Sequence, residues 1–350
     1  MNRKSLFTDT SHTPKKRMLL TTLLVIIFCF FHGCSDKKRI AESERVFVDE
    51  QGRAVKVNAE PQRIISLAPS VTETLFALGL GDRVVGVTSY CDYPPEAARK
   101  ERVGDTLRPN MEKIVALKPD LVIASTASQL EQFVRRLDEL GIPIYVSNPR
   151  GIDDVLASIE RIGEITGARE RSVELSGALR ARIDATERRV STLEKPKVLF
   201  ILGTEPLITA GAASFVTDLI RRAGGKSISE DAPGDYPQYS LETAIAKQPE
   251  VIFLQAGESA LPSRLKQTPA AESGRVYHLN DDLLLRPGPR IVDGLEQMAA
   301  KIHGEIGVHR SRNDLPRSGA MSLARSFKAG NQLKSFCRYA AIYAQPSDCL

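Results

Sequence analysis

RIISLAPSVTETLFALGLGDRVVGVTSYCDYPPEA, residues 63–97, contains a strand, a helix and a second strand in succession. RIISLAPS predicts a short apolar strand that ends at Pro69, and SVTETLFALGLG predicts an amphipathic helix that Gly79 and Gly81 close. RVVGVTS then predicts the second strand. Both strands are apolar throughout instead of alternating, which is typical of a parallel sheet with helices on both faces.

The same alternation continues to residue 150 and resumes after residue 195. NMEKIVALKPD and SQLEQFVRRLDELG predict helices, and LVIAS and IPIYVSN predict strands, so we expect residues 62–150 to form one α/β lobe. Residues 151–195 are almost purely helical, and their second half is a polar helix of the kind that bridges two lobes. Residues 196–307 open with the strand KVLFILG and close with the helix PRIVDGLEQMAAKIHGEIG, which predicts a second α/β lobe.

The two predicted lobes share a local pattern. NMEKIVALKPDLVIAS in the first resembles SLETAIAKQPEVIFLQ in the second, because each is a helix, a break at a proline and an acidic residue, and an apolar strand. We therefore expect an α/β fold class with two Rossmann-like lobes joined by a long rigid backbone helix. Two related lobes that face each other form a cleft, which is a common place for a small-molecule ligand.

Both ends of the chain lie outside this pattern. In residues 1–33, PKKR precedes MLLTTLLVIIFCFFHG, an uncharged run of sixteen residues that is short for a membrane helix and typical of a secretory signal peptide. The run ends in a Gly–Cys pair that resembles the lipobox of bacterial lipoproteins and predicts lipidation at Cys34. The alternatives are a plain signal peptide and an uncleaved anchor. Residues 34–61 predict a charged tether and a small β-hairpin with a turn at Gly52, and residues 308–350 predict a disordered basic tail.

Composition and motifs narrow the class of function. The net charge is +5, but the excess of positive charge lies in residues 1–17 and 308–350, so the middle is mildly acidic and predicts no nucleic-acid partner. The sequence has no GxGxxG motif after a strand, no Walker loop, no HExxH and no GxSxG. Its five histidines are scattered and its cysteines lack metal-type spacing, so we expect no enzyme activity, no metal site and no resident cofactor.

Three stretches resemble the iron-siderophore/cobalamin periplasmic-binding family: SYCDYPP (89–95), MEKIVALKPDLVIA (111–124) and RPGPRIVDGLEQMA (286–299). The resemblance covers roughly residues 63–307 and implies a class III periplasmic-binding-protein fold whose lobes move little. It also implies an exported monomer, lipid-anchored to the membrane at the periplasmic or cell-envelope face. Such a protein delivers cobalamin or a related corrinoid to an ABC permease that works with a separate ATPase. The alternatives are a ferric-siderophore or haem-binding protein of the same fold and, in another class, an enzyme or metal chaperone built on the same lobes.

The resemblance also implies site residues. Glu131 and Glu242, each in the first turn of its predicted helix, match the glutamates that dock on the permease; the alternative is a glutamate favoured there by the helix macrodipole. The positions that match the ligand site are Pro69, Tyr90, Tyr93, Thr106, Leu107, Tyr236, Tyr239, Asp282, Leu283 and Arg286. Tryptophans line the pocket in known relatives, whereas this chain has none. Thr106 and Tyr236 fall at such positions, which predicts a shallower pocket or one shaped for a different corrinoid.

Some of these residues also have purely structural alternatives. The Tyr93–Pro94–Pro95 sequence could be a rigid turn, and Pro69 could simply end a strand. Arg290 is expected to anchor the last helix instead of contacting ligand. Cys91 is expected to be a small packing residue, not a cobalt ligand.

Overall fold

The structure is a computed structural model that describes residues 44–304, apart from 107, 126–130 and 256–259. The predicted signal peptide, most of the predicted tether with Cys34, Leu107 and the predicted tail lie outside the described residues. The described part belongs to one compact unit that begins at Glu44. None of the helices within it is long and apolar enough to cross a membrane.

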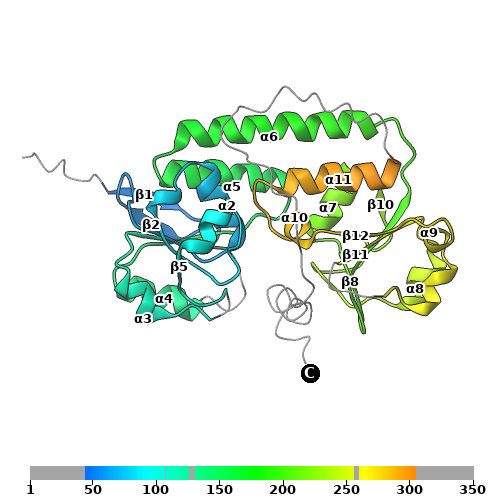
Figure 1. The fold of residues 1–350 in the computed structure, drawn as a ribbon, viewed down its shortest axis with the longest axis horizontal. Helices are drawn as coiled ribbons and strands as arrows, with labels where there is room; N and C mark the ends of the chain where they lie inside the picture. Colours follow the sequence, from blue (N-terminus) through cyan, green and yellow to red (C-terminus); the bar gives the residue numbers. More distant parts are fainter. Residues whose placement is uncertain (1–43, 107, 126–130, 256–259, 305–350) are drawn as a thin grey trace, which may run out of the picture. The chain divides into compact units, whose positions relative to one another are not determined.

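The first lobe, on the left in Figure 1, is built on a parallel sheet with the strand order β5-β4-β3-β6-β7. The apolar runs of the sequence become buried strands, because helices cover both faces of the sheet. The strands are β3 (Ile64–Ser66), β4 (Val84–Val87), β5 (Glu101–Arg102), β6 (Leu121–Ser125) and β7 (Ile144–Ser147). The connecting helices are α2 (Pro69–Ala77), α3 (Met111–Ala116) and α4 (Glu131–Glu139), with short 3-10 helices η1 (Gly81–Arg83) and η2 (Pro95–Arg99).

The second lobe repeats this design. Its sheet has the parallel order β10-β8-β11-β12, and β9 pairs antiparallel with β8. The strands are β8 (Lys197–Thr204), β9 (Leu207–Thr209), β10 (Lys226–Ser227), β11 (Val251–Gln255) and β12 (Val276–Leu279). The helices are α7 (Phe215–Arg222), α8 (Leu241–Ala246), η3 (Ser263–Gln267), α9 (Pro269–Glu272), α10 (Asp281–Leu284) and α11 (Ile291–His303). The α/β fold class expected from the sequence is confirmed.

A small hairpin, β1 (Arg45–Val48) and β2 (Ala54–Val57), covers the open edge of the first sheet. The backbone N–H of Glu50 donates to the carbonyl of Val146 at 3.0 Å, and the Arg53 guanidinium donates to the carbonyl of Ile144 at 3.2 Å. Exposed edge strands invite association with other chains, so these bonds protect β7. Gly52, where the sequence predicts the turn, has φ +82°, a conformation that favours glycine.

The lobes are linked by α5 (Ile152–Ile165) and α6 (Arg169–Val190), which break at Gly167 with φ +76°. The long polar helix α6 runs alongside α5 and then α11 (Figure 1). Arg171 donates to the Leu78 carbonyl of the first lobe at 3.0 Å, and Arg182 contacts Asp293 of the second at 2.6 Å. The polar side chains of α6 therefore bridge the two lobes, as the sequence predicts.

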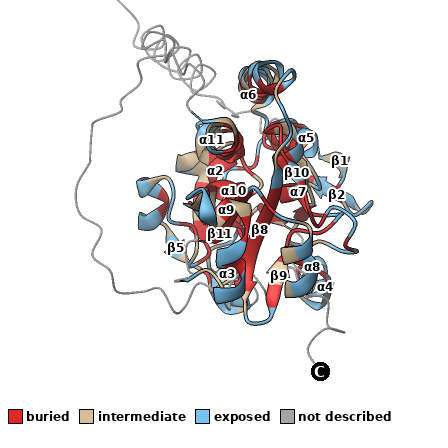
Figure 2. Ribbon diagram, turned by 90° about the vertical axis from the view of Figure 1, so that its right-hand side faces the viewer, coloured by how far each residue is buried: buried red, intermediate tan, exposed pale blue. Residues whose placement is uncertain are grey.

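One apolar cluster joins both lobes at this end of the molecule. It includes Leu75 of α2, Ile159 of α5, Phe200 of β8 and Val292 of α11, all almost fully buried. In Figure 2 the central strands are buried, whereas α6 keeps one side exposed. The shared core indicates that the two lobes pack on each other through the linking helices and α11, in addition to their own cores.

Candidate functional site

The loops after β4 and β12, which carry predicted site residues, contact each other across the two lobes. In parallel α/β sheets, the loops at the carboxyl ends of strands form the usual binding crevice. Tyr90 and Tyr93 follow β4, while Asp282, Leu283 and Arg286 follow β12. The two loops meet where Asp92 pairs with Arg286 and where Tyr93 stacks on Arg290.

Arg286 is a buried cation held by carboxylates of both lobes. Its Nη1 lies 2.7 Å from Oδ1 of Asp92 and 3.4 Å from Oε1 of Glu73, both in the first lobe. Its Nη2 lies 2.7 Å from Oδ1 of Asp282, one helical turn earlier in the chain. Only 7% of the side chain is exposed, so its charge is balanced by these neighbours and not by bulk water.

Arg290 makes a second contact between the lobes. Its Nε donates to Oε2 of Glu73 at 2.9 Å, and its Nη2 donates to Oε1 at 2.5 Å, so the pairing is bidentate. The guanidinium carbon also lies 3.9 Å from the centroid of the Tyr93 ring, at stacking distance. Burial works to lower the pKa of Arg290, but the hydrogen bonds and charge of Glu73 outweigh it and raise that pKa.

The segment from Arg286 to Arg290 fits closely against the start of α2. A Cβ added at Gly288 would lie 3.2 Å from the carbonyl oxygen of Ser70, which is tighter than an ordinary van der Waals contact. Arg290 occupies the N-cap position of α11 and thus does lie at the start of the last helix, as predicted. Its partner Glu73, however, lies in the other lobe, and the sequence did not indicate that pairing.

Glu73 and Asp92 are site residues that the sequence prediction missed. Glu73 lies in the first lobe's amphipathic helix α2, yet its side chain is 2% exposed. A carboxylate among the buried positions of a helix is the one local signal that could have drawn attention to it. Asp92 lies inside the family-specific stretch SYCDYPP, but an exposed aspartate beside a turn carries no signal of a partner in another lobe.

The other ligand-binding residues predicted in the first lobe differ in how far they are buried. Pro69 begins α2 as its first residue, a position that proline suits, and so starts a helix instead of ending a strand. Tyr90 is half-buried, whereas Tyr93 is exposed and stacks on Arg290. Thr106 is buried, and its hydroxyl has no hydrogen-bond partner within the described part of the chain. Leu107 lies outside the described residues.

The ligand-binding residues predicted in the second lobe fall into two groups by what their side chains or backbones contact. Asp282 and Leu283 belong to α10, and the Leu283 carbonyl lies so close to Gly294 of α11 that an added Cβ would be 2.4 Å from it. Tyr239 instead packs within its own lobe and donates its hydroxyl to the Ile228 carbonyl at 3.0 Å. Tyr236 packs against the large apolar cluster that joins the lobes. The structure thus brings Asp282 and Arg286 to Asp92 and gives Tyr239 an internal structural contact.

The predicted docking glutamates lie near the starts of helices in different lobes, although the helix that corresponds to α8 in the shared sequence pattern is α3 and not α4. Glu131 is the first residue of α4, and Glu242 lies in the first turn of α8. The Glu242 carboxylate is 66% exposed and pairs with Arg264, whose hydrogen bond lowers the pKa of Glu242. Both positions are at helix N-termini, where the macrodipole also favours a carboxylate.

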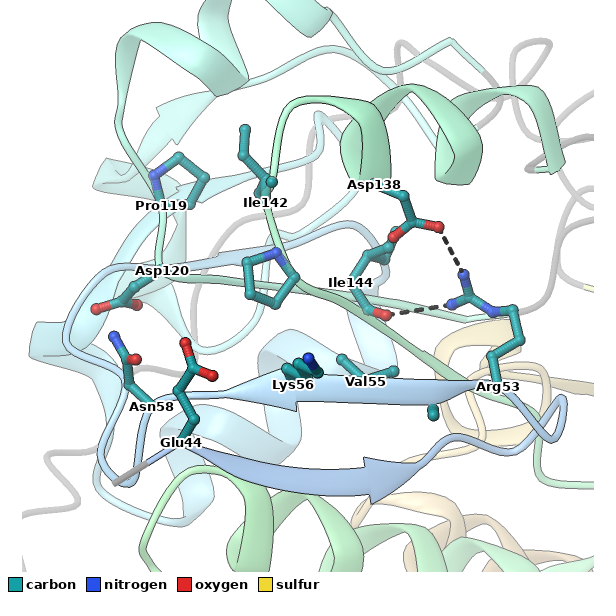
Figure 3. Close-up of a pocket in the computed structure, with 13 residues that line it drawn as sticks. Glu44, Arg53, Val55, Lys56, Asn58, Pro119, Asp120, Asp138, Ile142 and Ile144 are labelled. Carbon is teal, nitrogen blue, oxygen red and sulfur yellow. Dashed lines mark hydrogen bonds and ion pairs between the residues drawn. The ribbon is translucent and has the colours of Figure 1, made fainter. Parts of the chain in front are cut away.

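Two cavities of about 560 Å³ lie elsewhere in the described part of the chain. The first lies between the hairpin and the first sheet, where Arg53 reaches Asp138 and the Ile144 carbonyl (Figure 3). The second lies between the starts of α5 and α7 and is lined largely by charged side chains. Among the residues that the structure describes, no predicted ligand-binding residue lines either cavity.

Comparison with known proteins identifies the family. A family model described as periplasmic binding protein matches residues 64–283. The chain belongs to the periplasmic binding protein family. The observed parallel sheets and linking helices agree with this membership.

Two similar members of the family have names that describe their functions in different detail. This periplasmic binding protein is 34% identical over 241 residues to the vitamin B12-binding protein of Vibrio cholerae, covering 68% of this chain and 87% of that one. It is 31% identical over 309 residues to the uncharacterized ABC transporter substrate-binding lipoprotein YvrC of Bacillus subtilis, covering 83% and 98%.

Solved structures show the same fold. The crystal structure of the periplasmic vitamin B12 binding protein of Vibrio cholerae matches with a TM-score of 0.63 and 34% identity, covering 69% of this chain and 96% of that one. The apo form of a periplasmic heme-binding protein from Roseiflexus matches with a TM-score of 0.62 and 28% identity, covering 69% and 97%. The class III fold expected from the sequence is therefore confirmed.

Proposed function

We propose that this periplasmic binding protein is the substrate-binding component of an ABC importer and binds cobalamin or a related corrinoid between its lobes. The observation that carries the proposal is the similarity to the vitamin B12-binding protein of Vibrio cholerae, which spans 87% of that protein at 34% identity. The two α/β lobes and their linking helices support the same function, because ligands of such folds bind at the carboxyl ends of the strands.

The ligand would contact residues around Arg286 and its carboxylate partners Glu73, Asp92 and Asp282. Tyr90 and Tyr93 would supply aromatic surface from the first lobe, while Asp282 and Arg286 would supply a polar edge and Leu283 apolar surface from the second. A corrinoid is large, flat and partly apolar with amide groups at its edge, so it suits such a combination. Pro69, Thr106, Leu107 and Tyr236 are proposed as further contacts, and Tyr239 as a residue that supports them.

Delivery would use the two matched glutamates. Glu131 and Glu242 lie near the N-terminal ends of α4 and α8, one in each lobe, and would dock on the permease, while a separate ATPase supplies the energy. The protein itself would act as a monomer, catalyse no reaction and need no cofactor. It would be exported and held at the cell-envelope membrane by a lipid on Cys34, and the naming of the Bacillus relative as a lipoprotein supports this.

A haem-binding or siderophore-binding role is the second candidate. The similarity to the Roseiflexus heme-binding protein supports it, because that structure covers a comparable share of this chain. Tyr90 or Tyr236 would then offer a phenolate to the iron, whereas a siderophore would be held by arginine.

Calorimetric titration of the purified protein with cobalamin, cobinamide, haem and a ferric siderophore separates these functions. We expect one corrinoid to bind per protein, with no saturable binding of haem or siderophore. Binding of haem or siderophore without any corrinoid binding would contradict the proposed function and favour the second candidate.

A further inference from the structure

Asp92 and Arg286 form a contact between the lobes that has one fixed and one movable partner. The Arg286 side chain is 7% exposed, whereas the Asp92 side chain is 61% exposed. Buried side chains have few alternative positions, while an exposed aspartate can rotate into solvent at low cost. The Asp92 carboxylate is therefore the partner that can leave.

The backbone beneath Asp92 is held firmly. Nη1 of Arg102 donates to the carbonyls of Thr88 at 2.6 Å and of Cys91 at 3.0 Å, and Cys91 is fully buried. Release of Arg286 thus needs only a rotation of the Asp92 side chain and no rearrangement of the loop.

Arg286 remains paired when Asp92 leaves. Asp282 lies 2.7 Å from Nη2, and Glu73 lies 3.4 Å from Nη1. An exposed ion pair contributes little stability, whereas a buried charge without a partner costs much more. The Asp92 carboxylate can therefore move away while the positive charge of Arg286 stays compensated by Asp282 and Glu73.

We propose that Asp92 competes with the ligand for Arg286 and thereby selects ligands whose hydrogen-bond acceptor at this position is uncharged, such as a carboxamide oxygen. The proposal rests on the proposed function, since it requires the ligand to approach Arg286. A displaced Asp92 stays close by and keeps its negative charge, and Asp282 adds its own, whereas Glu73 is already paired with Arg290. A ligand carboxylate would meet repulsion that a carboxamide would not.

The test compares Asp92→Ala with the matched control Glu96→Ala, which removes an exposed carboxylate from the same segment. Each protein is titrated by calorimetry with cyanocobalamin and with the derivative in which one peripheral amide is hydrolysed to a carboxylate. We expect Asp92→Ala to raise the affinity about 3-fold for cyanocobalamin and about 10-fold for the carboxylate derivative. The control should change neither.

Two results would overturn the inference while leaving the proposed function intact. One is weaker binding of both corrinoids by Asp92→Ala, which would make Asp92 a direct ligand contact. The other is unchanged affinity for both.

If the wild-type protein binds neither corrinoid, the proposed function fails, and a second measurement still decides the role of Asp92. Modification of Arg286 by phenylglyoxal, followed by mass spectrometry, should be faster in Asp92→Ala than in wild type and Glu96→Ala. An equal rate in all three proteins would refute the competition of Asp92 for Arg286.

Discussion

Glu73 occupies a buried position on α2, and it is the one charged side chain among the buried residues of that helix. Its charge is tolerated because Arg290 pairs with both of its oxygens and Arg286 lies 3.4 Å from one of them. Replacing a buried pair by apolar residues can be neutral, but removing one partner leaves an isolated charge. We therefore interpret Glu73 as a residue that fixes how the Arg286–Arg290 segment sits on α2.

Replacing Glu73 by glutamine tests this interpretation. The substitution keeps the size of the side chain but removes its charge, so Arg290 loses its buried carboxylate. We expect the free energy of unfolding to fall by about 3 kcal/mol, measured by denaturant titration. Glu96→Gln, at an exposed position, is the control and should leave stability unchanged. Equal stability of Glu73→Gln and wild type would show that the pair contributes nothing.

The chemistry of single residues was visible in the sequence, but their partners were not. Arg286 was recognised as a polar candidate, yet its contacts with Glu73 span 213 positions of the chain. Tyr239 was selected by its residue type, and only the fold shows its bond to the Ile228 carbonyl. Long-range pairing depends on how the lobes pack, which no local pattern records.

At the scale of elements, the sequence predicted strands and helices well because apolar periodicity is a local property. The strands β3, β4, β6, β7, β8 and β11 lie within the predicted apolar runs. Of the two glycines that interrupt the apolar stripe of the linking region, Gly163 lies inside α5 and Gly167 lies at the break between α5 and α6, with φ +76°. The placement of the hairpin on β7 could not be predicted, because it depends on an unpaired sheet edge.

The helices α4 and α8 carry the proposed contact with the permease. Reversing the charge of both Glu131 and Glu242 should abolish uptake in cells. The affinity for the corrinoid, measured by calorimetry, should stay within about 2-fold of wild type, because Glu242 pairs with Arg264 and not with a described ligand candidate. Glu139→Lys with Glu272→Lys, which changes exposed glutamates at the C-terminal ends of α4 and α9, is the matched control and should transport normally. Normal uptake by the double reversal at Glu131 and Glu242 would refute the docking role.

At the scale of the whole described unit, several contacts join the lobes in addition to the Asp92–Arg286 pair. Apolar side chains form one cluster that reaches into both lobes, α6 makes polar contacts with both, and Glu73 pairs with Arg290. Together these contacts favour lobes that keep their arrangement, so recognition of a ligand would depend on side chains such as Asp92 more than on closure of the lobes.

A crystal structure of the full protein grown with cobalamin tests the central claim most directly. We predict a corrinoid between the lobes, in contact with Tyr90 or Tyr93 on one side and with the segment after β12 on the other, and with the contacts of α6 to both lobes unchanged. A corrinoid bound instead in the cavity beside the hairpin, or on the outer surface of one lobe, would contradict the account.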